Sequence, residues 1–397
     1  VILALADFVN LAENDPDLLS VTWRGEANFS DERQGQIVAG NYTAAGTLAG
    51  RGLGYRAFLE CPPKPAGASC TSLLTPENQQ LVAIFDSGYP NAAPPHGGID
   101  HHPDLESLEQ IQRPDQQLPD RLVELRNFSN SSGTNDIVSH GSIVAGIIAG
   151  EGRPEFADAL QPGGTIVRGG GMDAQGFFLG SGIAPRSRLL VARLADNSLI
   201  DTSPGGRHDQ ALRWARSNNS DSTDRALLVN ESWNLVRTVP ASGTATDVVA
   251  VNQYDQKAQF YDARVRDANT LVAGVQPMTV VFAAGNQSWD RGANGGGGGV
   301  RFDSVGSPGT AKNVITVGAS ASYRPAPEPP LSCRDDVSRF LSDDATHVSA
   351  IGRFSGRGQF FSAAGTEKLH QKRIKPDLVA PAIRVFSTVP FYPFNFG

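Results

Sequence analysis

The sequence reads Leu81-Val82-Ala83-Ile84-Phe85-Asp86-Ser87-Gly88 where an unbroken apolar run stops at a polar turn. A continuous apolar run of this length is typical of a strand buried on both faces of a parallel sheet. Similar runs recur at residues 189–194, 227–229, 280–284 and 314–317. Helix-like segments lie between the runs at residues 143–149, 210–216 and 254–272. This alternation predicts an α/β fold, with a parallel sheet that carries helices on both faces.

Composition and charge exclude several classes of protein. The chain has 397 residues, of which 40% are hydrophobic, 19% are charged, 43 are glycine and 26 are proline. A chain with this balance is neither a coiled coil nor largely disordered. Its formal net charge is -7 and no basic face is visible, so we expect no nucleic acid and no membrane as a partner. The sequence also lacks the run of about 18 apolar residues that a membrane-spanning helix needs.

Long spacers separate the predicted strands and helices. They cover residues 90–135, 151–180 and 321–351 and are rich in Gly, Pro, Asp and Asn. We interpret them as surface insertions on one domain rather than as domain boundaries. We expect the chain to be a monomer.

Three polar residues mark the ends of apolar segments. Asp86 follows the first buried run, His140 opens a helix of small residues, and Asn286 follows the run at 280–284. A carboxylate that orients an imidazole, an imidazole that takes a proton and an amide that donates to an oxyanion make up most of an acyl-transfer site. Taken singly, each residue has an ordinary alternative: a turn for Asp86, a helix cap for His140 and a left-handed turn for Asn286.

The sequence around these three residues resembles the motifs of subtilisin-like serine proteases, the subtilases, in the same chain order. The matching segments are residues 81–88, 139–146 and 281–286, and further similar segments lie at 182–185, 307–319 and 375–381. The resemblance implies a three-layer αβα subtilisin-like fold with a central parallel sheet and large loop insertions. It also implies a secreted serine endopeptidase that acts on polypeptide substrates and needs no cofactor for its chemistry.

The resemblance assigns roles to individual residues. It implies that Asp86 orients His140, that His140 acts as general base and then general acid, and that Asn286 stabilises the oxyanion. It also implies that an extended peptide pairs with one strand edge and that the S1 pocket has two walls. The edge and first wall are Ser232, Trp233 and Asn234, and the opposite wall is Ala283, Ala284 and Gly285. The small residues of the opposite wall suggest a roomy pocket, and Trp233 has an alternative reading as a core aromatic residue.

The nucleophile departs from the family pattern. Subtilases carry it in a Gly-Thr-Ser motif, which occurs nowhere in this sequence. We therefore expect the chain to be truncated before the nucleophile, and we expect residues 1–397 alone to be inactive. The alternative is a protein that lost the serine and binds peptides at the Ser232 and Trp233 edge without cleaving them.

The resemblance also suggests how the chain is divided. Residues 1–30 resemble the C-terminal remnant of an inhibitory propeptide, which would bind the protein's own catalytic domain. Residues 31–80 form the lead-in of the mature chain, and residues 81–397 form a catalytic domain that is incomplete at its C-terminus. The alternative for residues 1–30 is an ordinary extension packed on the domain.

Cysteines and metal ligands give weaker signals. Cys61 and Cys70 are nine positions apart and can close a small disulfide, which would suit a secreted or extracellular protein, whereas Cys333 is left over. Three ordinary thiols are the alternative. Residues 102–105 resemble a stretch in which the subtilase Asp often binds calcium, so Asp104 is the candidate ligand of a structural calcium ion. We disfavour the alternative, a zinc cluster built from the neighbouring His and Asp residues.

Overall fold

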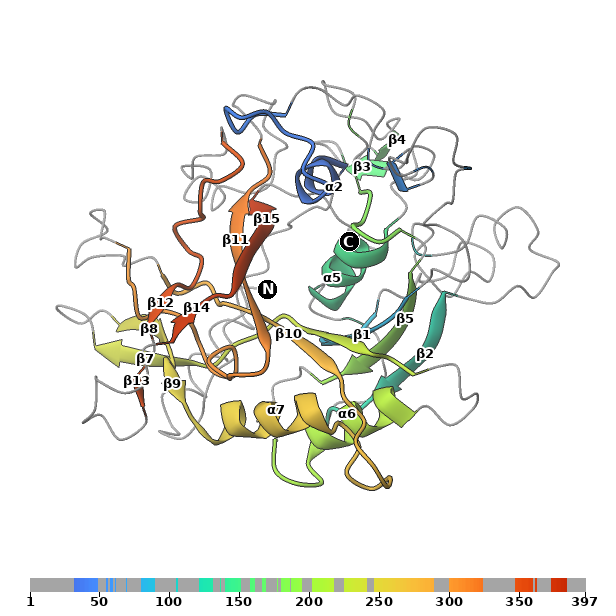
Figure 1. Cartoon of the computed structure of the whole chain (residues 1–397), viewed down its shortest axis with the longest axis vertical. Helices are drawn as coiled ribbons and strands as arrows, with labels where there is room; N and C mark the ends of the chain where they lie inside the picture. Colours follow the sequence, from blue (N-terminus) through green and yellow to red (C-terminus); the bar gives the residue numbers. More distant parts are fainter. Residues whose placement is uncertain are drawn as a thin grey trace, which may run out of the picture.

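Figure 1 shows the computed structural model of the whole chain. It describes residues 32–48, 80–89, 121–130, 140–150, 158–160, 166–168, 180–185, 187–194, 202–217, 225–240, 246–288, 300–323, 347–359, 361–362 and 373–383, together with residues 55, 58, 59, 61, 69, 105, 136 and 177. The N-terminal segment 1–30 lies outside these ranges, so its assignment to a propeptide stays a prediction.

A sheet of seven strands forms the centre of the molecule. Its order is β15-β11-β10-β6-β1-β5-β2, and every neighbouring pair is parallel. The strands are β1 (Leu81–Asp86), β2 (Leu122–Asn127), β5 (Arg188–Arg193), β6 (Leu228–Glu231), β10 (Thr279–Ala283), β11 (Ile315–Ala321) and β15 (Leu378–Ile383). The five apolar runs therefore became parallel strands, as predicted, and β1 and β5 are the most completely buried of them.

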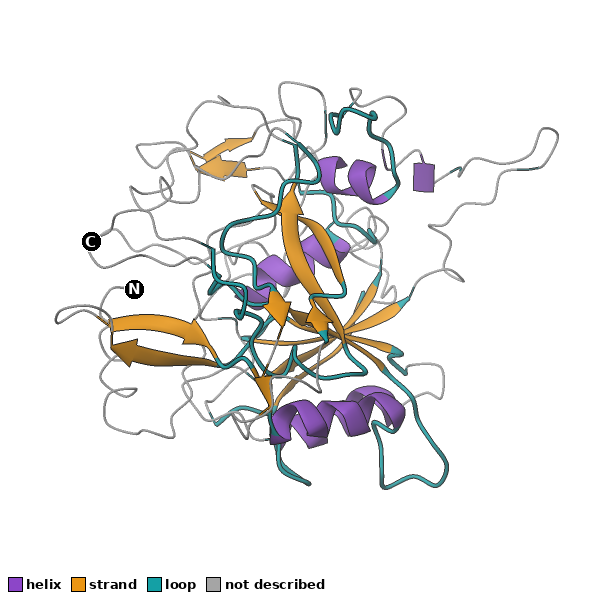
Figure 2. Ribbon diagram, turned by 60° about the vertical axis from the view of Figure 1, so that its left-hand side comes forward, coloured by secondary structure: helices purple, strands orange, loops and turns teal. Residues whose placement is uncertain are grey.

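Helices cover both faces of this sheet (Figures 1 and 2). They are α5 (His140–Ala149), α6 (Arg207–Ser217) and α7 (Gln256–Arg266). Helix α5 packs on one face, and α6 and α7 pack on the other. The resulting three layers confirm the predicted αβα subtilisin-like fold.

Side chains of β1 alternate between the two cores. Val82 and Ile84 pack in the core beneath α5, whereas Ala83 and Phe85 pack in the core beneath α6 and α7. Successive side chains of a strand point to opposite faces, so Asp86 continues the α5 series. The alternation alone directs the carboxylate of Asp86 towards the helix that His140 begins.

Helix α7 is shorter than the segment predicted at 254–272. Asp255 caps it, because its side chain accepts a hydrogen bond from the backbone nitrogen of Ala258 at 2.9 Å. The helix ends at Arg266, and Asp267 adopts an extended backbone. The prediction was wrong at both ends, because a cap at Asp255 and an extended residue at Asp267 limit the helix more strictly than its apolar periodicity.

Smaller elements surround the central layers. Helix α2 (Glu32–Val38) packs against β15, where the Gln34 side chain donates to the carbonyl of Pro381. The remaining strands pair two by two: β3 (Asp158–Leu160) with β4 (Ile166–Arg168), β7 (Val236–Pro240) with β8 (Thr246–Ala250), β12 (Gly358–Gln359) with β14 (Ile374–Lys375), and β13 (Phe361–Ser362) with β9 (Gln253–Tyr254).

Two further findings concern the predictions about a membrane-spanning helix and about the cysteines. Among the residues that the structure describes, no helix has the length and apolarity to cross a membrane. Cys61 is disulfide-bonded. Its expected partner Cys70 and the remaining Cys333 lie outside the described residues.

Candidate active site

The candidate site lies at the carboxyl edge of three neighbouring strands. Strand β6 lies between β1 and β10, and both pairings are parallel. The three strands therefore end at the same edge of the sheet, where ligands of open α/β sheets are usually bound. Asp86 is the last residue of β1, Ser232 directly follows β6, and Asn286 follows β10 by three residues.

The structure brings Asp86 and His140 into direct contact. The Nδ1 atom of His140 lies 2.6 Å from Oδ1 of Asp86. The Asp86 side chain is 3% exposed and the His140 side chain 18%. A buried carboxylate bonded to Nδ1 fixes the ring and leaves proton transfer to Nε2, the nitrogen that faces away from the carboxylate.

A second carboxylate, Asp136, ties the end of β1 to the start of α5. Its Oδ1 accepts from the Ser87 hydroxyl at 2.7 Å, and its Oδ2 accepts from the Ser142 backbone nitrogen at 2.7 Å. The Ser87 hydroxyl oxygen in turn accepts from the backbone nitrogen of Gly141 at 2.9 Å. Asp136 is 2% exposed, so this connection is buried. It fixes Ser87, which follows Asp86, and Gly141 and Ser142, which follow His140.

The start of α5 also packs closely against the turn after β1, at Gly141. A Cβ atom on Gly141 would lie 2.1 Å from the carbonyl oxygen of Gly88. Real Cβ atoms do not approach backbone oxygens so closely, so only glycine lets α5 begin this near to the turn after β1.

Asn286 stands exposed after a glycine turn. Gly285 has a φ of 94°, which favours glycine, and the backbone nitrogen of Asn286 donates to the Oε1 atom of Gln287 at 3.0 Å. Asn286 is thus an exposed residue three positions after β10, near the strand edge that also carries Asp86. An amide donor in that place is what a developing oxyanion requires.

The two predicted walls meet through Asn234. Its Nδ2 atom donates to Oε1 of Gln287 at 2.8 Å, and a Cβ atom on Gly285 would lie 2.8 Å from the same Nδ2 atom. On the opposite wall, the Ala284 nitrogen pairs with the carbonyl of Val317. The segments after β6 and β10 are therefore adjacent, and the buried Asn234 side chain fills space between them.

The comparison with protein families fits this geometry. Residues 77–392 match the model of the subtilase family. The chain belongs to the subtilase family. Subtilases are serine proteases, and this membership supports the serine-type peptidase class for the chain.

Solved structures with a similar fold have little sequence in common with this subtilase. The CspB protease of Clostridium perfringens is 14% identical, with 78% of this chain and 76% of that chain covered and a TM-score of 0.41. The epidermin leader peptide processing serine protease of Staphylococcus aureus is 14% identical, with coverages of 81% and 60% and a TM-score of 0.34. Sphericase is 16% identical, with coverages of 78% and 70% and a TM-score of 0.35. No curated protein matches the sequence.

Trp233 of this subtilase combines both readings that the sequence left open. It directly follows Ser232 of the candidate edge, yet its ring packs edge-on against the core residue Phe282 at 5.3 Å between centroids. Its indole nitrogen donates to Oε2 of Glu231 at 2.6 Å. The indole is thus anchored in the core, while its backbone lies in the irregular segment that follows β6, and pairing of this segment with a peptide stays a prediction.

Sequence reasoning missed the buried carboxyl groups Glu231 and Asp136. Glu231 is fully buried, and burial raises the pKa of its carboxyl to about 8. Its signal in the sequence was a glutamate two positions after the apolar run at 227–229. Asp136 had no such signal, because it lies in a stretch without apolar periodicity.

The predicted calcium ligand Asp104 lies outside the described residues. In the part of the chain that the structure describes, no three His, Cys, Asp or Glu side chains gather in a way that could hold a metal ion. The calcium site stays a prediction.

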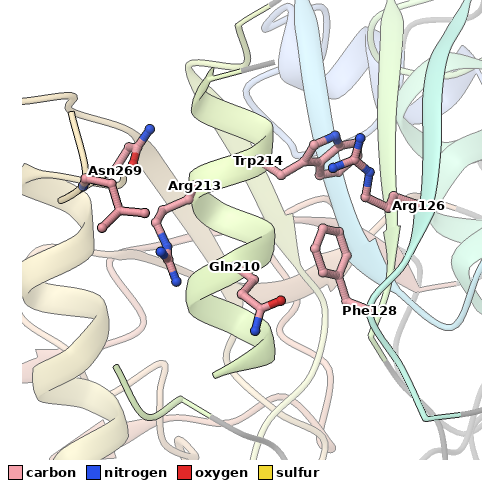
Figure 3. Close-up of a pocket in the computed structure, with 7 residues that line it drawn as sticks. Arg126, Phe128, Gln210, Arg213, Trp214 and Asn269 are labelled. Atoms are coloured by element: carbon pink, nitrogen blue, oxygen red, sulfur yellow. Dashed lines mark hydrogen bonds between the residues drawn. The ribbon is translucent and has the colours of Figure 1, made fainter. Parts of the chain in front are cut away.

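A separate cavity of about 320 Å³ lies beside α6 (Figure 3), and none of the candidate residues lines it. Its lining residues are Arg126, Phe128, Gln210, Arg213, Trp214, Asn269 and Leu271. Both arginines are bound by carboxylates, Arg126 by Glu124 at 2.5 Å and Arg213 by Asp209 at 3.0 Å. Their charges are thus already compensated, so the cavity has no evident preference for an anionic ligand.

Proposed function

We propose that this subtilase is a serine endopeptidase that hydrolyses peptide bonds with Asp86 and His140 as two members of a catalytic triad. The observation that carries the proposal is the 2.6 Å contact between His140 Nδ1 and Asp86 Oδ1 at the carboxyl edge of the sheet. Family membership supplies the reaction class, and this contact supplies the base with its orienting carboxylate.

Each proposed role follows from the chemistry of the group. Nε2 of His140 takes the proton of the serine hydroxyl as the serine oxygen attacks the peptide carbonyl, and later gives it to the leaving amine. Asp86 holds the ring and stabilises the imidazolium. The Asn286 amide donates to the oxyanion of the tetrahedral intermediate. Water then attacks the acyl-enzyme, and His140 again acts as the base.

The proposed nucleophile is a serine outside residues 1–397, since the family's Gly-Thr-Ser motif does not occur among them. Reading the coding sequence beyond Gly397 tests this directly. A Gly-Thr-Ser motif within a few tens of residues supports the protease, whereas an in-frame stop before any serine overturns it.

The proposed substrate is an extended polypeptide that pairs with residues 232–234 and 283–285. Pairing with a strand edge reads the backbone of the substrate, and the adjacent pocket reads its side chain. We also propose a secreted or extracellular monomer that is inhibited by its own propeptide and holds a structural calcium ion at Asp104. The bonded state of Cys61 favours an oxidising compartment.

Activity of a chain that contains the nucleophile tests the base. His140→Ala is expected to abolish casein hydrolysis, and unchanged activity would remove His140 from the mechanism. The second candidate function is peptide binding without cleavage, which the missing motif favours. It predicts that the full-length protein binds unfolded casein but leaves it intact.

A further inference from the structure

A buried chain of four polar side chains lies under the proposed peptide edge. Oε2 of Glu231 lies 2.6 Å from the indole nitrogen of Trp233, and Oε1 lies 2.9 Å from the hydroxyl of Tyr261. The Tyr261 hydroxyl in turn lies 2.8 Å from Nδ1 of His208. Glu231 and Tyr261 are 0% exposed and His208 is 4% exposed, so water takes little part in this chain.

The fold explains why Glu231 is so deeply buried. Val229, two positions earlier on β6, packs in the core beneath α6 and α7, and Glu231 continues that series. The carboxyl group therefore points into a core of aromatic rings, where Tyr261 packs edge-on against Phe282 at 4.7 Å. The candidate pair of Asp86 and His140 lies on the opposite face of the sheet.

Two arrangements of the protons satisfy the hydrogen bonds between these four side chains. In the first, Glu231 is a neutral acid: it donates through Oε1 to the Tyr261 hydroxyl, which donates to Nδ1 of His208. In the second, Glu231 is ionised, Tyr261 donates to it, and Nδ1 of His208 carries a proton and donates to Tyr261. The Trp233 indole, which is only a donor, serves Oε2 in both.

Electrostatics favours the neutral acid. Burial, together with the smaller effect of the nearby charge of Asp86, raises the pKa of Glu231 to about 8, although the hydrogen bonds from Trp233 and Tyr261 act in the opposite direction. Burial also holds the pKa of Tyr261 well above its ordinary value. Among the described residues, Tyr261 of α7 contacts Glu231 directly, His208 of α6 contacts Tyr261, and the charge of Asp86 acts on Glu231 from the other face of the sheet.

The nearby arginine of α7 does not compensate a charge on Glu231. Arg264 is bound to Asp209 of α6, with its Nε atom 2.6 Å from Oδ1. Among the described residues, the side chains hydrogen-bonded to Glu231 are Trp233 and Tyr261, so an ionised Glu231 would have no cation in direct contact.

We propose that Glu231 is a positioning residue that acts as a neutral carboxylic acid, holding the Trp233 indole and thereby the Ser232–Asn234 edge on which the peptide is bound. This inference rests on the proposed function for its peptide, but the protonation of Glu231 can be tested without it. Ionisation at alkaline pH would draw water to the buried carboxylate and loosen the end of β6, so peptide binding would weaken.

The first experiment measures urea unfolding of the wild type, Glu231→Gln and Glu124→Gln between pH 5 and pH 9. Gln reproduces the neutral acid, with one acceptor for Trp233 and one donor for Tyr261. Glu124 is the matched control, because it also accepts from a tryptophan indole, that of Trp214 at 2.9 Å, but its side chain is 29% exposed.

The direction in which stability changes with pH follows from the raised pKa of Glu231. The folded wild type holds a proton that the unfolded chain has lost, so its stability decreases as the pH rises from about 4.5 to about 8. The unfolding equilibrium constant of the wild type is expected to rise about tenfold per pH unit relative to that of Glu231→Gln, and to level off above pH 8. Glu124→Gln keeps Glu231, so the unfolding equilibrium constant of the wild type relative to that of Glu124→Gln should show no such trend. A gap between the wild type and Glu231→Gln that is constant, or that favours the wild type as the pH rises, overturns the neutral acid.

The second experiment measures KM and kcat for peptide hydrolysis by the full chain across the same pH range. The wild-type KM is expected to rise above pH 8 while that of Glu231→Gln stays level, since Gln cannot ionise. A parallel rise of KM in both proteins rejects the positioning role. A wild type that cleaves no peptide contradicts the proposed function alone, because the unfolding result still decides whether Glu231 is protonated.

Discussion

Nδ1 of His140 lies 2.6 Å from Oδ1 of Asp86, although the two residues are 54 positions apart in the chain. The contact joins the last residue of β1 to the first residue of α5. It needs no rearrangement to orient the imidazole, so its removal should affect turnover far more than folding.

Asp86→Asn tests the orienting role of the carboxylate. An amide at this place can hold the ring but favours the wrong tautomer, so kcat is expected to fall on the order of 10⁴-fold with KM nearly unchanged. Initial rates of peptide hydrolysis by the full-length chain measure this, with circular dichroism as the control for folding. A loss of less than tenfold would contradict the assignment.

Asn286→Ala tests the oxyanion donor. The amide is expected to bind the oxygen only as it becomes charged, so kcat should fall about 10²-fold to 10³-fold while KM changes little. The side chain is exposed, so the thermal unfolding temperature should not change. An increase in KM with an unchanged kcat would instead place Asn286 in ground-state binding.

Asp136→Ala tests the buried connection between Ser87 and Ser142. It removes the acceptor of the Ser142 backbone nitrogen and leaves the Ser87 hydroxyl with its longer bond to Asp86 Oδ1 at 3.2 Å, which is expected to reduce the free energy of unfolding by about 3 kcal/mol. Asp136→Asn keeps one carbonyl acceptor and should lose less. Urea unfolding of the two variants compares them, and equal stability of Asp136→Ala and wild type would show that the connection is not stabilising.

Gly141→Ala tests the close approach of α5 to the turn after β1. Its new Cβ would lie 2.1 Å from the Gly88 carbonyl, so α5 must move away and His140 with it. We expect a loss of both stability and turnover. The control is Gly205→Ala, where φ is 79° but no atom lies within 4 Å of the new Cβ. Strain alone should cost the control about 1 kcal/mol and leave turnover unchanged.

Asn234→Gly tests whether the Asn234 side chain restricts the S1 pocket. Removing it clears the space beside Gly285 and breaks the 2.8 Å hydrogen bond to Gln287. The ratio of kcat/KM for a peptide with a large apolar P1 residue to that for one with a small P1 residue should rise roughly tenfold. An unchanged ratio would mean that this side chain lies outside the path of the substrate.

The sequence was informative where burial imposes a simple pattern. Strand β1 is apolar throughout and buried on both faces, so its end at Asp86 could be predicted. Strand β2 was missed because it lies at the edge of the sheet and is only partly buried, which leaves charged residues such as Glu124 and Arg126 within it. An edge strand has no continuous apolar run to recognise.

The residues of the candidate site also differ in how well the sequence predicted them. Asp86, His140 and Asn286 stand next to recognisable strands and helices, so their type and position suggested chemistry. The contacts of Asp136 and Glu231 depend on side chains from distant parts of the chain, such as Tyr261, which is 30 positions from Glu231. Those partners are set by the packing of helices on the sheet, which no local pattern reveals.

The spatial order of the strands also bears on how the protein folds. Strand β6 separates β1 from β10, although about 140 residues lie between β1 and β6 in the sequence. Parallel pairing of such distant segments is slow, because the entropy of closing large loops is lost before the contacts form. A newly made chain would therefore bring the end of β1, which carries Asp86, beside the ends of β6 and β10 only when most of its sheet is complete.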